Sequence, residues 1–442
     1  MGIFVTVPDH KPDGPTIGLE NLKEARVLVV GGGGREHAIV DALSRSIYVK
    51  KIFCAPGNAG IASQAECVPI GDGKVDELLE FARREHIDLT VVGPEVPLSA
   101  GIADAFRAAG LRIFGPSKAA ARIESSKSFA KEIMEKKGVP TASYKTFTDY
   151  SEALEYVKAG SIPVVLKYDG LAAGKGVVVA MSLEEADAAL KDMLLEDVFG
   201  KGKVVVEEFL TGPEFSFMAL VRGKEVWPLA LAQDHKRAFD GDEGPNTGGM
   251  GAYSPLPYIT PEDEEFALEK VMKPVAEGLF EEGCPFEGLL YGGLMKTPQG
   301  IKVIEFNCRF GDPETEVVLP RLETDIYTMF SAVVDGTAMP EIRWSDDHVI
   351  GFVLASKGYP GKYTKGFEID GLEEALADPS VRIYHMGTSV KDGKTVTSGG
   401  RVMMVTASAP TLKEARDKAL SAVDKIRCDN LFHRTDIGHY VL

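Results

Sequence analysis

Cysteine is scarce in this sequence of 442 residues, and its few copies follow no pattern. Their number is odd and no Cys-x-x-Cys pair occurs, which argues against a disulfide framework and against a structural zinc site. Such a chain is expected in a reducing compartment, so we expect a cytoplasmic location. The five cysteines are Cys54, Cys67, Cys284, Cys308 and Cys428.

Long apolar runs and an excess of positive charge are also lacking. No apolar run reaches the ~18 residues that span a bilayer, and the net charge is −17 without a block of like charges. These absences argue against a membrane protein and against nonspecific binding to nucleic acid. Residues 1–25 have neither a basic start nor an apolar core, so we expect a flexible extension and no signal peptide.

The first patterned segment, residues 26–45, reads RVLVV-GGGG-REHAIVDALSR and predicts a strand, a tight turn and a helix. This is typical of an open parallel α/β sheet, whose helix N-terminus can hold an anion. A dinucleotide site is disfavoured, because Gly31 and Gly33 match G-x-G-x-x-G but Glu36 occupies the third position. A bound phosphate at residues 32–35 and an unliganded turn both remain open.

Two further loops follow predicted strands of the same sheet. APGNAG contains Asn58, and GPEVP contains Pro94 and Glu95. Because the carboxyl ends of parallel strands meet at one edge, we expect these loops to lie beside the GGGG turn, where such folds bind ligands.

The segment PVVLKYDGLAAGKGVVVA predicts two strands, at 164–167 and 177–180, around a glycine loop that contains Lys175. It is not a P-loop, because the spacing is one residue short, Gly176 replaces the metal-binding hydroxyl, and a strand follows instead of a helix. A plain flexible hairpin is the alternative. We favour a flap over nucleotide phosphates, since Lys167 ends the incoming strand.

A valine-rich strand then ends at residues 207–210 (EEFL), with Glu214 further on. Such a strand end can grip an adenine and an acid can take ribose hydroxyls, although paired acids are also common on surfaces. The next segment, residues 232–255, is polar and glycine-rich, and we expect it to be a long functional loop that starts with Asp234, Lys236 and Arg237.

The stretch KVIEFNCRFGDPETEVV predicts a strand that places Val303, Glu305 and Asn307 on one face. Asp312, with proline after it, is expected to cap the next helix. Hard oxygen ligands favour Mg2+ or Mn2+, and Arg309 favours a phosphoryl group. An edge strand with a solvated polar face is the alternative. Further on we expect a helix at 261–282, a strand at 288–295, and an amphipathic helix with a stripe of Leu412, Ala415, Ala419, Val423 and Ile426.

Seven motifs in order resemble the glycinamide ribonucleotide synthetase (phosphoribosylamine–glycine ligase) family of ATP-grasp enzymes, over residues 26–437. They are GGREHA, APGNAG, GPE, DGLAAGKGV, QDHKR, NTGGMGAYSP and RFGDPE. The resemblance implies an α/β and α+β multidomain fold. We expect an open parallel α/β (pre-ATP-grasp) domain at 26–121, an ATP-grasp domain at 122–345 with a flap subdomain at about 140–205, and a small C-terminal α+β domain at 346–442.

The resemblance also implies a reaction of de novo purine synthesis. ATP, glycine and 5-phosphoribosylamine would give ADP, phosphate and glycinamide ribonucleotide through a glycyl phosphate. The implied partners are these small molecules, together with a transient contact to the enzyme that makes the amine, and the chain would be a monomer or a weak homodimer.

The matching positions carry the roles that the resemblance implies. ATP would contact Lys127, Lys167, Gly170, Leu171, Ala172, Ala173, Gly174, Lys175, Gly176, Glu207, Glu208, Phe209, Leu210 and Glu214. Phosphoribosylamine would lie near Gly33, Gly34, Arg35, Glu36, Asn58, Pro94, Glu95 and Arg237. Glu305 and Asn307 would hold Mg2+ or Mn2+. Arg309 would neutralise the transferred phosphoryl group, and Asp234, Lys236 and Asp312 would hold glycine or the amine.

Two departures from the family pattern stand out. Many ATP-grasp enzymes supply another acid to the metal from the preceding strand, but that strand here reads LLYGGLM. Tyr168 also replaces a small residue before the flap glycines. Another ATP-grasp ligase, a nonenzymatic nucleotide-binding protein and a nicotinamide-dependent oxidoreductase are the alternatives. The arginine motif argues against another ATP-grasp ligase, and the retained metal pair argues against a nonenzymatic protein. Glu36 argues against an oxidoreductase.

Overall fold

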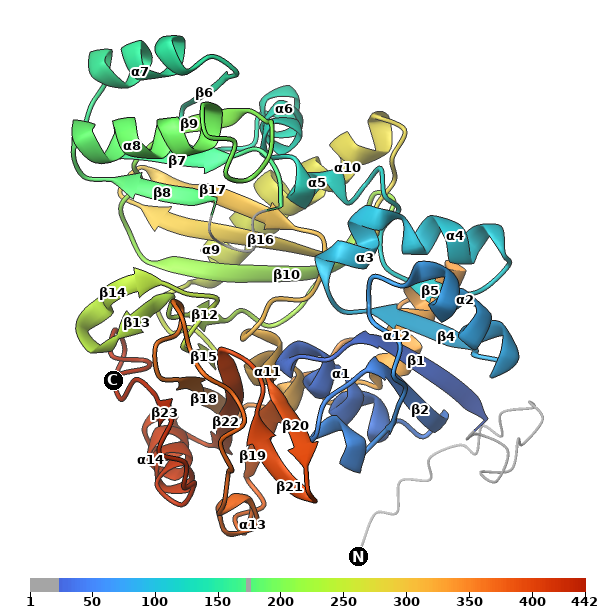
Figure 1. The fold of residues 1–442 in the computed structure, drawn as a ribbon. Coiled ribbons are helices and arrows are strands. Elements are labelled where there is room, and N and C mark those ends of the chain that lie inside the picture. Colours follow the sequence, from blue (N-terminus) through green and yellow to red (C-terminus); the bar gives the residue numbers. More distant parts are fainter. Residues whose placement is uncertain (1–23, 172–175) are drawn as a thin grey trace, which may run out of the picture.

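The computed structural model describes residues 24–171 and 176–442, and it has the predicted α/β and α+β multidomain fold (Figure 1). The expected N-terminal extension lies almost entirely outside the described residues, so its conformation stays a prediction. Among the helices of the described part, none is long and apolar enough to cross a membrane.

The N-terminal unit is an open parallel sheet in the order β3-β2-β1-β4-β5. Its elements are β1 (Ala25–Gly31), α1 (Gly34–Ser44), β2 (Val49–Pro56), β3 (Glu66–Cys67), α2 (Val75–Arg84), β4 (Leu89–Val92), α3 (Glu95–Ala100), α4 (Ile102–Ala108) and β5 (Ile113–Phe114). Residues 27–30 are fully buried, as expected for a central strand covered on both faces. The three predicted loops meet at one edge, where Asn58 Nδ2 donates to Gly32 O (2.9 Å) and Gly93 N–H to Val30 O (2.9 Å).

Two four-stranded antiparallel sheets form the ATP-grasp part. We call the sheet with the shorter strands the smaller sheet, and Figure 1 shows it above the larger one. The strand orders are β6-β9-β7-β8 and β11-β10-β16-β17. The smaller sheet and its helices comprise β6 (Tyr144–Phe147), α7 (Tyr150–Ala159), β7 (Val164–Tyr168), β8 (Val177–Ala180), α8 (Leu183–Leu194) and β9 (Val204–Glu208). The larger sheet comprises β10 (Glu214–Arg222), β11 (Glu225–Pro228), β16 (Glu287–Thr297) and β17 (Gly300–Asn307), with α11 (Thr315–Val318) and α12 (Ile326–Asp335) after it.

The helices around the larger sheet are more broken than their sequences predict. Two helices, α5 (Arg122–Ser125) and α6 (Lys127–Lys137), occupy a segment that reads as one helix. They separate at Ser126, whose backbone is extended. Its hydroxyl caps α6 by accepting a hydrogen bond from the Phe129 N–H. The predicted helix at 261–282 consists of α9 (Pro261–Ala267), a π turn at 268–272 and α10 (Lys273–Glu281).

The expected loop at residues 232–255 is instead partly strand. It contains β12 (Gln233–Asp234), β13 (Arg237–Phe239), β14 (Glu243–Asn246) and β15 (Gly251–Ser254), and β12 and β15 extend the C-terminal sheet in the order β12-β15-β18-β22-β19. All four residues of β15 are buried, although the glycine, alanine and serine around Tyr253 resemble a loop in the sequence. The rest comprises β18 (His348–Ser356), α13 (Leu372–Ala375), β19 (Val381–His385), β20 (Thr388–Lys391), β21 (Lys394–Thr397), β22 (Arg401–Ala409), α14 (Leu412–Val423) and β23 (Leu431–Phe432). The predicted stripe of α14 is buried or partly buried.

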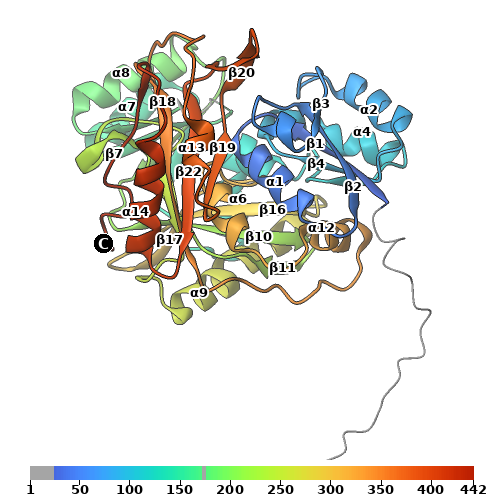
Figure 2. The same ribbon diagram turned by 90° about the horizontal axis from the view of Figure 1, so that it is seen from below.

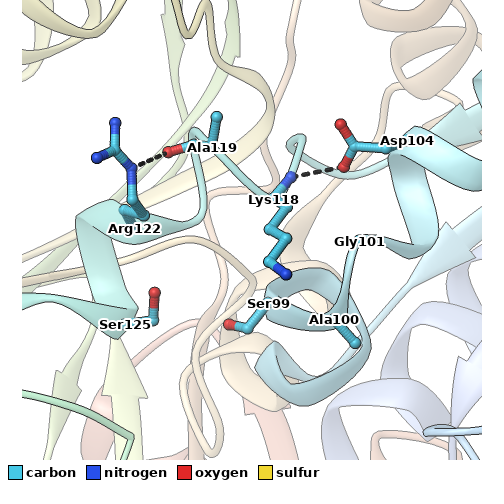
Figure 3. A pocket seen from close by; sticks show the side chains of 8 residues that line it. All are labelled: Ser99, Ala100, Gly101, Asp104, Lys118, Ala119, Arg122 and Ser125. Atoms are coloured by element: carbon cyan, nitrogen blue, oxygen red, sulfur yellow. Dashed lines mark hydrogen bonds between the residues drawn. The ribbon is translucent and has the colours of Figure 1, made fainter.

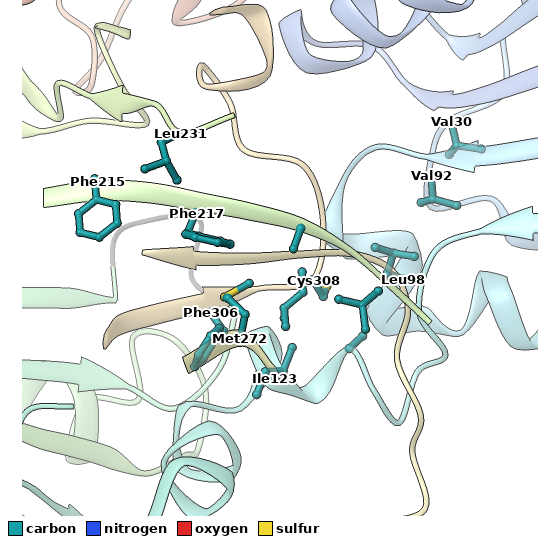
Figure 4. Close-up of a cluster of buried hydrophobic side chains, with 14 of the residues drawn as sticks. Val30, Val92, Leu98, Ile123, Phe215, Phe217, Leu231, Met272, Phe306 and Cys308 are labelled. Atoms are coloured by element: carbon teal, nitrogen blue, oxygen red, sulfur yellow. The ribbon is translucent and has the colours of Figure 1, made fainter. Parts of the chain in front are cut away.

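One hydrophobic core connects the N-terminal unit with the ATP-grasp part (Figure 4). Val30 and Val92 of the parallel sheet belong to the same buried cluster as Phe217 of β10 and Phe306 of β17. Ile123 of α5 lies in this cluster and is 1% exposed. The loops of the first sheet are therefore held at a fixed place beside β17.

The N-terminal and C-terminal units meet where α1 packs on β19 (Figure 2). The backbone N–H of His385 donates to His37 Nδ1 (2.8 Å), and Asn58 Nδ2 donates to His385 O (2.7 Å). Burial disfavours the charged imidazole and lowers the pKa of His37 to about 3 and that of His385 to about 4. Both side chains are therefore neutral at physiological pH, and His37 can accept its hydrogen bond.

This contact predicts acid sensitivity. Unfolding restores an ordinary histidine pKa of ~6.5, so below that pH the unfolded chain binds more protons and the free energy of unfolding falls. We expect the urea midpoint to drop as the pH is lowered from 7 to 5. His37→Gln, which retains an acceptor, should reduce the slope, whereas His433→Gln, outside this interface, should not. If the urea midpoint of His37→Gln falls with pH as steeply as that of the unaltered chain, other groups control the loss of stability in acid.

Candidate active site

The predicted metal ligands lie on β17, an edge strand of the larger sheet. A register shift places Gly293 opposite Glu305 but Leu294 opposite Val303, so Ile304 is the extra residue of a β-bulge. The exposed carbonyl of Ile304 accepts a hydrogen bond from Lys167 Nζ (2.8 Å). The bulge therefore connects β17 to the end of β7 in the smaller sheet, where Lys167 is the second-last residue.

The bulge corrects the predicted alternation of side chains. Val303 and Phe306 both belong to the core, at 0% and 2% exposure, because the extra residue reverses the pattern between them. Glu305 is half-buried, and Asn307 keeps its two-residue spacing from it beyond the bulge. The two predicted metal ligands, Glu305 and Asn307, thus lie on one face of β17 as predicted, but Val303 does not lie on that face.

Three lysines surround Glu305. Burial disfavours its charged form, yet the charges of Lys236, Lys167 and Lys127 outweigh burial and lower the pKa of the carboxyl. Lys127 Nζ also donates to Gly170 O (2.9 Å), at the start of the flap loop. Several cations around one carboxylate fit a polyphosphate with a metal ion.

Glu207 pairs with one of these lysines, Lys167, and with a fourth, Lys131. Its Oε2 is 3.0 Å from Lys167 Nζ and its Oε1 is 3.3 Å from Lys131 Nζ, with all three side chains buried. Burial, opposed by Glu207, lowers the pKa of Lys131 to about 8. The carboxylate therefore neutralises lysines. The backbones of Glu207 and Glu208 both pair with β7, so of the predicted hinge residues 207–210 only the last two lie beyond β9.

Arg309 is held between two acids from the N-terminal half. Its Nε lies 3.4 Å from Glu95 Oε2 and its Nη2 lies 3.0 Å from Glu124 Oε1. Burial disfavours the charged guanidinium, but these carboxylates outweigh burial and raise its pKa. Sequence reasoning placed Glu95 near the substrate and missed Glu124, whose only signal was an acid three residues before Lys127.

Glu124 also contacts the two residues before Arg309. Its Oε2 accepts from the Cys308 backbone N–H (2.8 Å). With the Asn307 amide oriented to satisfy its neighbours, Nδ2 donates to Glu124 Oε1 and to Phe306 O, both at 3.2 Å. This orientation leaves Asn307 Oδ1 for a cation.

The donor set fits a hard cation that completes its shell from a ligand. Glu305 and Asn307 offer oxygen atoms, which suit Mg2+ or Mn2+. Across residues 24–171 and 176–442, no group of three or more His, Cys, Asp or Glu side chains is arranged to hold a metal ion. Gly293 and Tyr291 lie opposite the two ligands on β16, so this strand adds no acid.

A second cluster of charges includes two of the predicted catalytic acids. Asp312 does not cap a helix as predicted, since α11 begins at Thr315. Its Oδ1 lies 2.9 Å from Arg401 Nη1 of β22, an ion pair that the local sequence could not indicate. Burial and the neighbouring Glu314 raise the pKa of Asp234, whose Oδ1 has no hydrogen-bond partner in the described part of the chain. Asp234 can therefore take up a ligand donor through Oδ1, and so can the neighbouring Glu316, whose two carboxylate oxygens also have no hydrogen-bond partner among the described residues.

The turn before α1, where a bound phosphate and an unliganded turn were both open, contacts carboxylates of the chain itself. The Gly33 N–H donates to Glu36 Oε2 (2.7 Å), and the Arg35 N–H donates to Asp312 Oδ2 (3.3 Å). Asn58 is saturated, because its amide donates to Gly32 O and His385 O while its Oδ1 accepts from residues 60 and 61. Its role in the structure is to hold two units together.

The other predicted residues are divided between the site and its surroundings. Lys236 Nζ lies 3.4 Å from Glu214 Oε2. Arg237 is exposed and donates to Gly244 O (2.7 Å) in the β13–β14 hairpin, away from these clusters. In the flap, Tyr168 OH donates to Gly200 O (3.2 Å). The predicted contacts Ala172, Ala173, Gly174 and Lys175 lie outside the described residues.

A cavity of about 540 Å3 lies beside α5 (Figure 3). It is lined by Ser99, Ala100, Gly101, Asp104, Lys118, Ala119, Arg122 and Ser125. None of the predicted site residues lines it. Arg122 and Ser125 of α5 border the cavity, whereas Glu124 of the same helix contacts Arg309.

The contrast between Glu207 and Glu208 gives a stability prediction. Glu207→Gln leaves two buried lysines without a charged partner, so the free energy of unfolding should fall by about 3 kcal/mol. Glu208 is exposed and pairs with Lys302 at 3.3 Å, so Glu208→Gln should change it by less than ~1 kcal/mol. Urea unfolding of both variants checks this. Equal effects would contradict the structural role of Glu207.

Comparison with known proteins agrees with this architecture. Three sequence models of phosphoribosylglycinamide synthetase match the chain: the N domain at residues 25–124, the ATP-grasp (A) domain at 125–315 and the C domain at 349–440. The phosphoribosylamine–glycine ligase of Halalkalibacterium halodurans is 52% identical over 414 residues, covering 93% of this chain and 96% of that protein. The ligase of Pasteurella multocida is 48% identical over 419 residues, covering 93% and 97%.

Solved structures agree as well. The crystal structure of phosphoribosylamine–glycine ligase from Thermotoga maritima has a TM-score of 0.83 and 34% identity, and covers 93% of this chain and 100% of that one. Biotin carboxylase from Campylobacter jejuni, at 16% identity and a TM-score of 0.72, shares the fold. The resemblance in the motifs is thus confirmed: the chain belongs to the phosphoribosylglycinamide synthetase (phosphoribosylamine–glycine ligase) family.

Proposed function

We propose that this chain joins glycine to 5-phosphoribosylamine with ATP, and that the chemistry takes place at β17. An oxygen of the glycine carboxylate attacks the γ-phosphorus of ATP, and ADP leaves. The amine nitrogen then attacks the carbonyl carbon of glycyl phosphate, loses a proton and expels phosphate. The observation that carries the proposal is that the charges of Lys127, Lys167 and Lys236 all act on Glu305, with Lys127 hydrogen-bonded to Gly170 at the start of the predicted flap.

The nucleotide is held between the two sheets of the ATP-grasp part. Lys127 and Lys167 contact its phosphates, and residues 170–176 of the flap cover them. The hinge at residues 207–210 takes the adenine, with Phe209 supplying an exposed apolar face. Glu214 accepts from the ribose hydroxyls. Glu207 contributes indirectly, because its carboxylate fixes Lys167.

Neutralisation of charge supplies most of the catalysis, since no protein nucleophile is needed. Glu305 and Asn307 Oδ1 hold Mg2+ or Mn2+, which neutralises phosphate charge when bound. Arg309 stabilises the phosphoryl group in transfer. Its ion pairs with Glu95 and Glu124 fix its orientation before the substrates bind.

Glycine and phosphoribosylamine bind where the N-terminal and C-terminal units face the ATP site. Asp234, Lys236 and Asp312 hold glycine or the amine, and Arg237 needs to move to join them. The N-terminal loops take the ribose part through Gly33, Gly34, Arg35, Glu36, Pro94 and Glu95. Because carboxylates occupy the turn, it favours the hydroxyl and amine donors of this substrate, and Asn58 shapes the turn instead of binding.

The cellular setting follows from the substrates. The reaction uses an unstable amine, ATP and glycine, so we place the protein in the cytoplasm, as a monomer or weak homodimer in transient contact with the enzyme that makes the amine.

Phosphate release with single omissions tests the activity. We expect release from ATP only when glycine and freshly made phosphoribosylamine are both present, and no stimulation by other amino acids. ATP turnover that ignores both omissions would contradict the ligase assignment.

Glu305→Gln tests the place of the chemistry. The variant removes the negative charge that balances three lysines and that binds the metal ion. Phosphate release should therefore fall by ~100-fold or more. Glu225→Gln, which changes an exposed acid of β11 in the same sheet, is the control for a lost surface acid. Near-normal turnover in Glu305→Gln with an intact unfolding midpoint would remove β17 from the centre of the site.

A further inference from the structure

Glu124 contacts three consecutive residues of the catalytic strand end: Asn307, Cys308 and Arg309. We propose that Glu124 is a positioning residue that fixes the Asn307 amide so that its oxygen, and not its nitrogen, faces the nucleotide metal. The proposal rests on the proposed function of β17 and adds a residue that takes no part in the chemistry itself.

The hydrogen-bonding inventory supports the proposal. An ionised carboxylate only accepts hydrogen bonds, whereas an asparagine amide has a donor end and an acceptor end. Glu124 Oε1 therefore requires the Nδ2 end of Asn307, and Phe306 O, at 3.2 Å from the same nitrogen, requires it too. Oδ1 is then the end that remains for a cation. Without such a partner, either end of the amide could point at the metal.

The position of Glu124 is itself fixed. Ile123, directly before it, is 1% exposed and lies in the core shown in Figure 4, which also contains Cys308. The second carboxylate oxygen is held by the Cys308 N–H at 2.8 Å, and Arg309 Nη2 lies 3.0 Å from the first. The carboxylate therefore has little freedom to turn, which is what a positioning residue requires.

Glu124→Gln separates positioning from simple packing, because the side chain keeps its shape but loses one acceptor. The Cys308 backbone N–H cannot turn, so the glutamine oxygen stays on it and the NH2 faces Asn307. Asn307 Nδ2 then meets an NH2 group where it met a carboxylate oxygen, so only Phe306 O still favours this orientation, and Nδ2 competes with Oδ1 for the place at the metal. Asn307→Asp in this background restores an oxygen, since one carboxylate oxygen accepts from Gln and the other remains for the cation.

The test is a double-mutant cycle of Mn2+ affinity, measured by electron paramagnetic resonance with a nonhydrolysable ATP analogue. We expect Glu124→Gln to weaken Mn2+ binding by about 10- to 100-fold, as is usual for residues that orient metal ligands. Asn307→Asp should improve Mn2+ affinity about tenfold more in the Glu124→Gln background than in the wild-type background. Ser125→Ala, on the same helix but facing the cavity, should leave Mn2+ affinity unchanged.

Two results would overturn the proposal. One is wild-type Mn2+ affinity in Glu124→Gln, and the other is an equal effect of Asn307→Asp in both backgrounds. Thermal unfolding of each variant shows whether the fold is kept, and the cycle still reports the coupling if all variants are equally destabilised. The omission assay on the unaltered chain tests the ligase activity separately, so failure of one result does not imply failure of the other.

Discussion

A buried charge must be neutralised where it lies, and this constraint organises the structure around β17. An isolated ion in the interior costs several kcal/mol or more. Arg309 therefore lies between Glu95 and Glu124, and Lys167 lies on Glu207. The cations that a polyphosphate needs are thus kept in place by acids behind them, and the acids are not available as ligands.

These neutralising contacts also join the parts of the chain. Glu95 belongs to the N-terminal unit, so its contact with Arg309 links the loops of that unit to the end of β17. Arg401 of β22 reaches Asp312 at 2.9 Å, which brings the C-terminal sheet to the same centre. Although the C-terminal segment carries no catalytic motif of its own, it supplies a charge on which the site depends. The site is complete only when all units are assembled.

The sequence predicted the features whose causes are local. Glycine turns after strands placed the loops at residues 31–34 and 57–58, and alternation with the Glu-x-Asn spacing identified β17. The bulge at Ile304 could not be predicted, because it depends on pairing with β16. Glu124 contacts Cys308 across 184 residues of sequence, and no periodicity encodes such a contact. The strand β15 was missed because three of its four buried residues are glycine, alanine and serine, which have the composition of a loop.

The paired acids explain how Arg309 can serve a phosphoryl group although it is already in ion pairs. A guanidinium has five N–H donors in a rigid plane. Nε faces Glu95, one Nη2 hydrogen faces Glu124, and Nη1 lies 3.4 Å from Phe310 O. These contacts leave N–H groups in the same plane with a fixed direction. Donors that are oriented before the reaction need no reorganisation as charge moves to the phosphoryl oxygens, which is the most effective form of electrostatic catalysis.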